Sequence, residues 1–437
     1  MKDKKLLIYG LGTTGLSAID ALAEDNTLYI YDDNAARMES FGASLPVYED
    51  QEIDLVVKSP GIPLESGRLV DLAARNIPII SDVELAYRIS ECENFVAISG
   101  TNGKTTITDL LYHMLLDGGK SAYMGGNVGI GILPLAKRAK KDDILVVECS
   151  SFQLETVINF RPKVAILTNI TEDHLDHHKS VDAYRESKKN IYKNQREGDH
   201  LILNIDDPYL ALLGEEAEGA LVVSTAPVRQ DGAFLDGGTL YIRYGSDLIP
   251  FMEREEMLLP GDHNVRNALE AALCAYLMGV SPKSVRETLM HYKGVDHRME
   301  FLGEFAGIRV YNDSKGTNPD STDVALAGLE GPIRLLAGGF SKGSDFVPLF
   351  HRHRDKIAGL YLFGETKDLM AEEARGEGIE EIHTFETLNE ATKAVTDAAL
   401  SGDTLLLSPA CASWDQFKNF EERGDLFKTL IAEKWGG

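Results

Sequence analysis

The chain has 437 residues, enough for roughly three domains of about 150 residues each, which excludes a single small binding module. Hydrophobic residues make up 43% and charged residues 26% of the composition, as in folded domains, which excludes wholesale disorder. The 44 basic and 69 acidic side chains give a net charge of −25, which argues against a nonspecific binder of nucleic acid or of anionic membranes.

The N-terminus resembles the basic start of a signal peptide over residues 1–5, but glycines and Asp20 soon interrupt the apolar residues that follow. No run of about 18 apolar residues occurs in the sequence, so we expect a soluble, cytoplasmic protein without membrane insertion. The four cysteines are widely spaced and include no C-x-x-C pair, which predicts reduced thiols.

Short apolar runs alternate with helical patterns from one end of the chain to the other, which predicts an α/β fold with parallel sheets covered by helices. We expect three domains: a Rossmann-like domain over residues 1–92, a mononucleotide-binding domain of the P-loop type over 93–294, and a Rossmann-like domain over 295–437. The predicted strands are 6–9, 28–31, 54–58, 95–99, 144–147, 164–167, 309–311, 333–336, 360–363 and 404–407. The predicted helices are 15–22, 105–116, 181–194 and 264–278, and residues 233–251 are predicted to form a β-hairpin.

The first glycine-rich turn has the sequence Gly10-Leu-Gly12-Thr13-Thr14-Gly15 and lies between a predicted strand and a predicted helix. Glycines there permit a tight turn, and the helix N-terminus suits a phosphate. Asp32 ends the next strand, where a carboxylate can accept a hydrogen bond from a ribose. The pattern is compatible with NAD, with another nucleotide such as a UDP-sugar, and with a turn that serves only close packing.

The second glycine-rich turn, GTNGKTT over residues 100–106, also joins a strand to a helix and is typical of a phosphate-binding loop. Its backbone amides would surround phosphates, Lys104 would supply a positive charge, and Thr105 would ligate Mg²⁺. Position 98 is Ile98 where a strict Walker A motif has glycine, so this loop is a shortened variant.

Two segments after this loop carry candidate metal ligands. Glu148 ends a predicted strand, where its carboxylate would lie near the phosphates, and it is our candidate for Mg²⁺. Residues 171–178 contain three histidines and three carboxylates, including His174. This composition fits a zinc site, a solvated loop of mixed charge, or a Mg²⁺ contact, and the nearby phosphate loop favours Mg²⁺. Composition alone does not distinguish Lys188, Asn264 or Asn267 from ordinary helical residues.

Taken together, the motifs resemble the Mur ligases of peptidoglycan synthesis over nearly the whole chain. They are GTNGKTT, GGNVG, ECSSFQLE, TNITEDHLD, YRESK, GDHNVRNAL, DHRME, NDSKGTNP and SPACASWDQFKNFEERG. Folylpolyglutamate synthases share the motif GTNGKTT and the region around His174. These two features therefore imply only an ATP-dependent amide ligase. The last two motifs resemble the D-glutamate-adding branch, and the D-N-P-R type motif of ligases that add a diamino acid is absent from the sequence.

The resemblance implies a reaction in which ATP phosphorylates the terminal carboxylate of UDP-N-acetylmuramoyl-L-alanine and the amine of D-glutamate attacks the acyl phosphate. It implies Mg²⁺ as cofactor, ligated by Thr105, Glu148, His174 and a carbamylated Lys188, with Lys104, Glu148, His174 and Lys188 as the catalytic set. The implied ATP contacts are Gly100, Thr101, Asn102, Gly103, Lys104, Thr105, Thr106, Asn127, Asn264, Asn267, Arg298, Asp313 and Lys315.

The substrate sites follow from the same resemblance. The implied contacts of D-glutamate are Thr317, Lys342, Ser413 and Phe420. The implied contacts of the UDP-sugar are Gly12, Thr13, Thr14, Gly15, Asp32, Ser59 and Gly61, and Asn34 stands where some relatives have a basic residue near the uracil. We expect a monomer whose partners are these small molecules, with no nucleic-acid partner.

Three other functions remain open at this point. A folylpolyglutamate synthase would share the ATP loop but would not need the turn at residues 10–15. A nucleotide-sensing regulator would keep the ATP loop without the chemistry, whereas every catalytic position of the family is present here. An NAD-binding protein would use Gly10, Gly12, Gly15 and Asp32, and NADH fluorescence would change on mixing.

Overall fold

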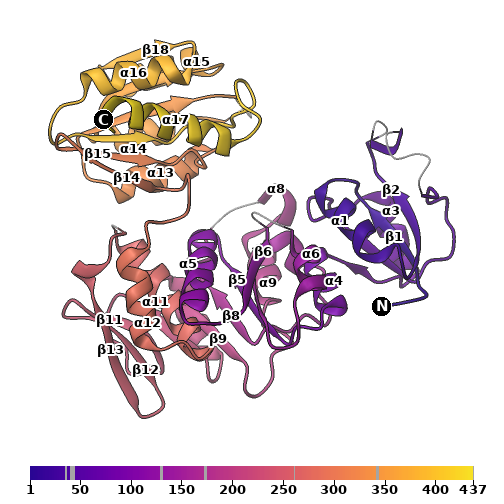
Figure 1. Cartoon of the computed structure of the whole chain (residues 1–437). Coiled ribbons are helices and arrows are strands. Elements are labelled where there is room, and N and C mark those ends of the chain that lie inside the picture. Colours follow the sequence, from indigo (N-terminus) through magenta and orange to yellow (C-terminus); the bar gives the residue numbers. More distant parts are fainter. Residues whose placement is uncertain are drawn as a thin grey trace. The chain divides into compact units, whose positions relative to one another are not determined.

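A computed structural model describes residues 1–34, 37–39, 45–127, 131–171, 175–259, 261–340 and 344–436. Contacts between Cα atoms divide the chain into two compact units. The first unit contains Met1–Met257 and Asn264–His291, and the second contains Leu258–His263 and Tyr292–Gly437. Three sheets, each with flanking helices, give the predicted α/β fold (Figure 1).

The N-terminal sheet has four parallel strands in the order β2-β1-β3-β4. Its elements are β1 (Lys5–Tyr9), α1 (Thr13–Leu22), β2 (Thr27–Tyr31), β3 (Leu55–Lys58), α3 (Gly67–Ala74), β4 (Ile79–Ile80) and α4 (Asp82–Ile89). Successive side chains of a strand point to opposite faces. Leu6 and Ile8 accordingly belong to one buried cluster, and Leu7 and Tyr9 to another, so both faces of this sheet are covered.

The central sheet has nine strands in the order β13-β12-β11-β10-β9-β8-β5-β7-β6. It is parallel except for β12, which pairs antiparallel with both of its neighbours. Its strands are β5 (Asn94–Ser99), β6 (Ala122–Gly126), β7 (Ile144–Glu148), β8 (Val164–Leu167), β9 (His200–Asn204), β10 (Leu221–Ser224), β11 (Gly232–Asp236), β12 (Thr239–Tyr244) and β13 (Asp247–Glu253). Its helices are α5 (Lys104–Asp117), α6 (Ile132–Arg138), α7 (Ser151–Leu154), α8 (Leu175–His178), α9 (Val181–Lys189), α10 (Pro208–Glu216), η1 (Arg254–Glu256), α11 (Asp262–Leu277) and α12 (Pro282–His291).

Helix α4 joins the first two sheets into one unit. The fully buried carboxylate of Glu84 accepts hydrogen bonds from the amides of Ile158, Asn159 and Phe160, which follow α7. One continuous apolar cluster also contains residues of both sheets. A carboxylate that accepts several amide hydrogen bonds fixes a segment firmly, because each such bond is charge-assisted.

The C-terminal sheet has six strands in the order β14-β15-β19-β16-β17-β18, with β14 antiparallel to β15 and the other pairs parallel. Its elements are β14 (Glu300–Phe305), β15 (Ile308–Asn312), α13 (Pro319–Gly328), β16 (Ile333–Gly338), α14 (Val347–His353), β17 (Ile357–Phe363), α15 (Lys367–Gly376), β18 (Ile382–Phe385), α16 (Leu388–Ala398), β19 (Thr404–Leu407) and α17 (Phe420–Trp435). Leu335 packs with the helices on one face and Leu336 with α16 and α17 on the other.

The structure confirms each predicted strand to within a few residues and corrects two other elements. The helix predicted over 181–194 ends at Lys189, because the chain continues in turns from Asn190. The hairpin predicted over 233–251 is a three-stranded meander, β11-β12-β13. The domain boundaries at residues 92 and 294 stay predictions.

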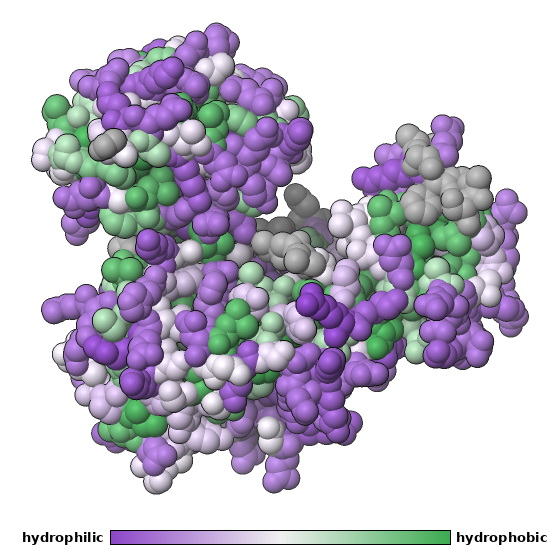
Figure 2. Space-filling model, viewed as in Figure 1, coloured by the Kyte–Doolittle hydropathy of each residue, from purple (hydrophilic) through white to green (hydrophobic). Residues whose placement is uncertain are grey.

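Hydrophilic side chains cover most of the visible face of both units (Figure 2). Within the described ranges, no helix is both long enough and apolar enough to cross a membrane.

Candidate active site

The loop of residues 100–106 joins β5 to α5, as the sequence predicts, and two of its glycines have backbone conformations that other residues rarely adopt. Gly100 has φ +149° and Gly103 has φ +86°. A Cβ on Gly100 would lie 1.9 Å from Oγ1 of Thr168, and a Cβ on Gly103 would lie 2.6 Å from Oδ1 of Asn267. The tight turn therefore depends on glycine at both positions.

Residues of the segment after β8 hold this loop in place. Asn102 donates its amide to Oδ1 of Asn169 at 2.9 Å, and its carbonyl accepts from Oγ1 of Thr168 at 2.5 Å. The amide of Thr101 donates to the carbonyl of Asn169 at 2.9 Å. The hydroxyl of Thr101 lies 3.1 Å from that of Tyr184 on α9. These contacts hold the loop in a fixed shape. The amides of Thr101 and Asn102 already donate to Asn169, so in this structure they are not directed at a phosphate.

Helix α5 begins directly after Gly103, and this N-cap residue has no side chain that could cap the first turn. Lys104, Thr105 and Thr106 form that first turn. The N-terminal end of a helix carries a partial positive charge and directs amide groups outward, which favours phosphate.

The amines of two lysines contact carbonyl oxygens of the loop. The amine of Lys104 donates to the carbonyls of Gly100 at 2.9 Å and Thr101 at 2.7 Å. Lys188 on α9 is 1% exposed, and its amine donates to the same Gly100 carbonyl at 2.8 Å. It also lies 3.4 Å from Oγ of Ser99 and over the ring of Tyr184. The structure therefore brings Lys188, which the sequence alone could not single out, to the phosphate-binding loop.

Glu148 ends β7 beside the same loop, since it pairs with Ile98 of β5. Its side chain is 2% exposed, and Oε1 accepts from Nδ2 of Asn127 at 3.1 Å. Its other oxygen, Oε2, is buried and accepts no hydrogen bond from the residues that the structure describes. A buried carboxylate oxygen without a partner is costly unless a cation or water satisfies it, so Glu148 fits a Mg²⁺ ligand.

Asn264 and Asn267 lie one turn apart on α11 and are both buried. Nδ2 of Asn267 donates to Oδ1 of Asn264 at 3.3 Å, and Asn267 is also the neighbour that a side chain on Gly103 would meet. Both asparagines therefore lie next to the phosphate-binding loop.

The N-terminal sheet carries a pocket of about 600 Å³ at the carboxyl ends of its strands. Its lining includes four of the residues expected to contact the UDP-sugar, namely Gly12, Asp32, Ser59 and Gly61. Ligands of open parallel sheets bind at this edge. Thr13, Thr14 and Gly15 begin α1 beside the pocket but do not line it. A Cβ on Gly15 would lie 1.8 Å from the carbonyl oxygen of Gly10, so this glycine serves close packing.

Asp32 holds the first glycine-rich turn in place. Its carboxylate accepts from the amide of Leu11 at 2.6 Å and from the amide of Asn34 at 2.8 Å, and Arg37 lies 3.6 Å away. Burial by itself would raise the pKa of Asp32, but the two amides and the Arg37 guanidinium outweigh it and lower that pKa. Asp32 is therefore an anion that orders the turn.

In the second unit, the turn before β14 and the loop after β15 pack together. The amide of Met299 donates to Oδ1 of Asp313 at 3.2 Å, and the amide of Lys315 donates to the carbonyl of His297 at 2.9 Å. Arg298 precedes Met299, and its charge acts on Asp313. Burial raises the pKa of Asp313 to about 6. A hydrogen bond from Ser408 and the positive charge of Arg298 lower this pKa, but burial outweighs them. The structure thus brings Arg298, Asp313 and Lys315 together.

Three of the four residues expected to contact D-glutamate are described in the same unit: Thr317 and Ser413 lie in loops, and Phe420 begins α17. Thr317 donates its amide to the carbonyl of Lys315 at 2.9 Å, and the amine of Lys315 lies over the ring of Phe420. Ser413 is buried and directly follows Ala412, which bridges to Phe340. Two expected site residues, His174 and Lys342, lie outside the described residues.

Three features of the site were missed from the sequence. Arg37 lines the pocket of the N-terminal sheet and supplies a cation that Asn34 cannot. Thr168 and Asn169 hold the phosphate-binding loop, although the motif TNITEDHLD contains both. Arg423 is fully buried and donates to the carbonyls of Ser314 at 2.7 Å and Cys411 at 3.1 Å. The motif FEERG contains Arg423, but no spacing rule indicates a partner so far along the chain.

The chain is similar to known proteins along nearly its whole length. Residues 98–275 match the Mur ligase middle domain, and residues 297–411 match the Mur ligase glutamate ligase domain. The UDP-N-acetylmuramoylalanine--D-glutamate ligase of Thermoanaerobacter sp. (strain X514) is 40% identical to the chain, with 99% of each covered. The protein of the same name from Latilactobacillus sakei subsp. sakei (strain 23K) is 39% identical, over 99% of this chain and 98% of that protein.

Solved structures of low sequence identity share the fold. The UDP-N-acetylmuramate-alanine ligase of Thermotoga maritima superposes with a TM-score of 0.59 at 20% identity, over 98% of this chain and 99% of the other. The MurF ligase of Thermotoga maritima in complex with ADP gives a TM-score of 0.59 at 17% identity, over 99% and 96%. With relatives of about 40% identity along its whole length, the chain belongs to the Mur ligase family.

Proposed function

We propose that the chain is an ATP-dependent ligase that joins D-glutamate to UDP-N-acetylmuramoyl-L-alanine in the synthesis of peptidoglycan precursors. The observation that carries this proposal is the identity of 39–40% along the whole chain to relatives with that printed activity. The phosphate-binding loop beside a buried carboxylate supports ATP as the second substrate.

In the proposed reaction, the terminal carboxylate of UDP-N-acetylmuramoyl-L-alanine attacks the γ-phosphorus of ATP, and ADP leaves. The amine of D-glutamate then attacks the acyl phosphate, the tetrahedral intermediate collapses, and phosphate leaves as the amide forms. In both steps negative charge accumulates on phosphate oxygens. Positive groups at fixed positions stabilise this charge. Lys104 and the first turn of α5 supply such groups.

Glu148, Thr105 and His174 are the proposed ligands of Mg²⁺, which when bound neutralises phosphate charge. The buried Oε2 of Glu148 supports this assignment. Asn127 donates to the other oxygen of Glu148, so it orients the carboxylate.

We also propose that Lys188 is carbamylated. Its amine and that of Lys104 donate to one carbonyl oxygen, so two ammonium groups would lie close together. A carbamate converts Lys188 from a cation into an anion, which removes the repulsion and adds an oxygen ligand for Mg²⁺. The contact of its amine with the carbonyl of Gly100 in the phosphate-binding loop supports this role.

The remaining residues receive the other substrates. Gly12, Asp32, Ser59 and Gly61 line the pocket proposed for the UDP-sugar, and Arg37 supplies a positive charge there for the diphosphate. Thr317, Lys342, Ser413 and Phe420 are the proposed contacts of D-glutamate. Asn264, Asn267, Arg298, Asp313 and Lys315 are the proposed contacts of the nucleoside and phosphates of ATP.

We further propose that the chain acts as a monomer in the cytoplasm. Light scattering of the purified chain after size exclusion tests this, because a dimer would double the measured mass.

Release of phosphate from ATP tests the proposed function. The chain is mixed with ATP, Mg²⁺ and UDP-N-acetylmuramoyl-L-alanine, together with D-glutamate, L-glutamate, L-lysine or no amino acid. We expect sustained release only with D-glutamate, and mass spectrometry should detect the dipeptide product. Equal release with L-lysine, or with no amino acid, would refute the assignment of the acceptor.

A further inference from the structure

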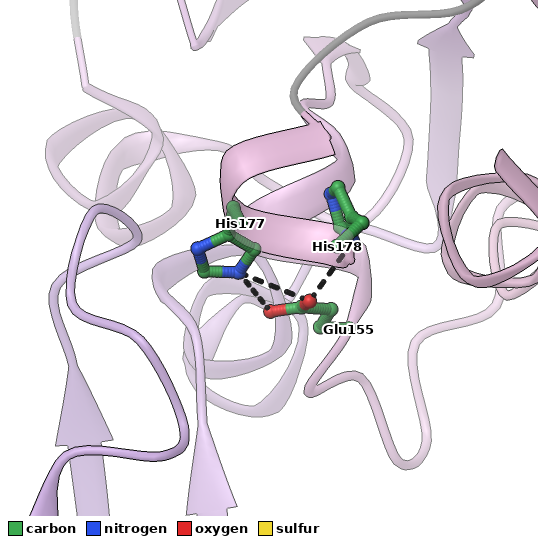
Figure 3. A group of neighbouring side chains, drawn as sticks. All are labelled: Glu155, His177 and His178. Carbon is green, nitrogen blue, oxygen red and sulfur yellow. Dashed lines mark hydrogen bonds and ion pairs between the residues drawn. The ribbon is translucent and has the colours of Figure 1, made fainter. Parts of the chain in front are cut away.

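Three side chains outside the proposed Mg²⁺ site form a separate cluster. Glu155 directly follows α7, and His177 and His178 end α8. One ligand atom from each residue lies within 4.8 Å of the others. Figure 3 shows both imidazole rings directed at the carboxylate of Glu155. Neither histidine has a role in the proposed reaction.

The distances from Glu155 to each histidine match those between the ligands of a bound metal ion. Nε2 of His177 lies 3.1 and 3.0 Å from the two carboxylate oxygens, and Nδ1 of His178 lies 3.2 Å from Oε1. Atoms that bind one Zn²⁺ ion at about 2.0–2.2 Å lie roughly 3 to 3.5 Å from one another. A small shift of these side chains therefore suffices to admit an ion.

The second nitrogen of His178 is already fixed. Nε2 of His178 lies 2.9 Å from Oγ of Ser151 at the start of α7. With the proton on Nε2, the imidazole donates to this hydroxyl and turns the lone pair of Nδ1 toward Glu155. A hydrogen bond to the outer nitrogen is the usual way in which proteins orient a histidine that binds a metal.

Packing restricts both rings. The ring of Phe152 stacks on His178 with centroids 5.5 Å apart and contacts the edge of His177 at 4.5 Å. The side chain of His178 is 1% exposed, whereas those of His177 and Glu155 are 13% and 17% exposed. Solvent thus reaches one side of the cluster, which leaves access for an ion and a position for water.

The charge of Glu155 also acts on one buried lysine, Lys58. Burial lowers the pKa of Lys58 to about 8. Among the charges that oppose this lowering, that of Glu155 has the largest effect. Lys58 itself donates to the carbonyls of Pro60 and Ile62.

We propose that Glu155, His177 and His178 form a binding site for a transition-metal ion of the Zn²⁺ class. Two imidazoles with one carboxylate favour such ions over Mg²⁺, which prefers oxygen ligands. The ion would tie α8 to the end of α7. This inference does not depend on the proposed ligase activity.

Binding of Co²⁺ to the full-length, tag-free chain tests the site, because a Co²⁺ ion with four or five ligands has an intense visible absorption that hydrated Co²⁺ lacks. We expect the parent chain to bind one equivalent of Co²⁺ with this absorption, and Zn²⁺ should displace the bound Co²⁺. His177→Gln should weaken Co²⁺ binding by about tenfold or more, because it removes one of three ligands. His177 is the ligand of choice for substitution, since it is less buried than His178.

Two further variants separate this site from others in the chain. Glu148→Gln should retain the absorption, because Glu148 belongs to the proposed Mg²⁺ site. His351→Gln should retain it as well, because His351 is an exposed histidine that pairs with Glu377 at 2.7 Å in the second unit. Thermal unfolding without metal should be alike in the parent chain and His177→Gln, and Zn²⁺ should raise the midpoint of the parent chain alone.

Two results would overturn the proposal. One is the lack of an intense absorption in the parent chain with excess Co²⁺. The other is an absorption of equal affinity in His177→Gln, which would place the bound ion elsewhere.

Discussion

Lys104 and Lys188 donate to the same acceptor, the carbonyl oxygen of Gly100, at 2.9 and 2.8 Å. One lysine belongs to the phosphate-binding loop and the other lies on α9, 84 residues further along the chain. Because like charges at short range disfavour each other, conversion of the buried Lys188 to a carbamate would leave Lys104 as the cation that faces phosphate.

Replacement of Lys188 by alanine tests the proposed carbamate. Lys188→Ala should lower kcat by about 100-fold or more, because the variant loses a group beside the reacting phosphates. A small carboxylate such as acetate should restore part of the activity by taking the place of the carbamate. Lys189→Ala is the matched control, since Lys189 pairs with Glu186 on the outer face of the same helix. Full activity of Lys188→Ala without acetate would contradict the assignment.

Lys104→Ala should lower the rate of phosphate release by about 100-fold or more, because the negative charge that develops on the phosphates loses a nearby cation. Acetate should not rescue this variant. Lys140→Ala, at an exposed position of the same sheet domain, should retain full activity. Comparable activity of Lys104→Ala and Lys140→Ala would show that ATP binds elsewhere.

Gly103→Ala should destabilise the chain more than Gly219→Ala, although both glycines have positive φ, +86° and +80°. Alanine in this conformation costs roughly 1–2 kcal/mol at either position. At Gly103 the new Cβ would also lie 2.6 Å from Oδ1 of Asn267, whereas at Gly219 it would enter open space. Thermal midpoints measure the difference, and equal midpoints would argue against the close approach of α11 to the loop.

The pKa of Asp313 predicts a dependence of stability on pH. Its folded value of about 6 exceeds the ordinary value of about 3.9, so between these values the folded chain binds more protons than the unfolded chain. The stability that the protonated carboxyl contributes is therefore present below about pH 4 and is lost as the pH rises through 6. The loss amounts to up to about 3 kcal/mol.

Asp313→Asn stays neutral at every pH and should avoid this loss. Its thermal midpoint relative to that of the parent chain should rise between about pH 4 and pH 6 and then stay level. Asp355→Asn, at an exposed position of the same unit, serves as the control and should show a constant difference. A constant difference for Asp313→Asn as well would contradict the raised pKa.

Arg423 links two loops of the proposed D-glutamate site through Ser314 and Cys411. Arg423→Met should destabilise the chain by about 3 kcal/mol, because buried carbonyl oxygens lose their donors. Arg423→Lys should restore part of the stability but leave the KM for D-glutamate raised, since lysine lacks the planar fork of donors. Arg375→Met on the exposed side of α15 is the control. An unchanged KM in Arg423→Lys would exclude a positioning role.

The sequence by itself determined the fold class, ten of the strands and the phosphate-binding loop, whereas strands such as β6, β9 and β10 were not predicted. The predicted features depend on local patterns: apolar runs that alternate with helical periodicity, and glycines at a strand-to-helix turn. Gly100, Gly103 and Lys104 lie within five residues of one another, so their arrangement follows from the loop itself.

Only the tertiary structure decided which distant residues join that loop. Lys188 lies on a helix whose sequence is typical of a solvated surface. It is buried because α9 packs beside β5, where its amine reaches Ser99, and because it lies over the ring of Tyr184 on its own helix. Glu155, His177 and His178 likewise meet because α8 packs against the end of α7. Such contacts depend on how elements pack across a sheet, and no periodicity of the sequence records which side chains then share an acceptor or a carboxylate.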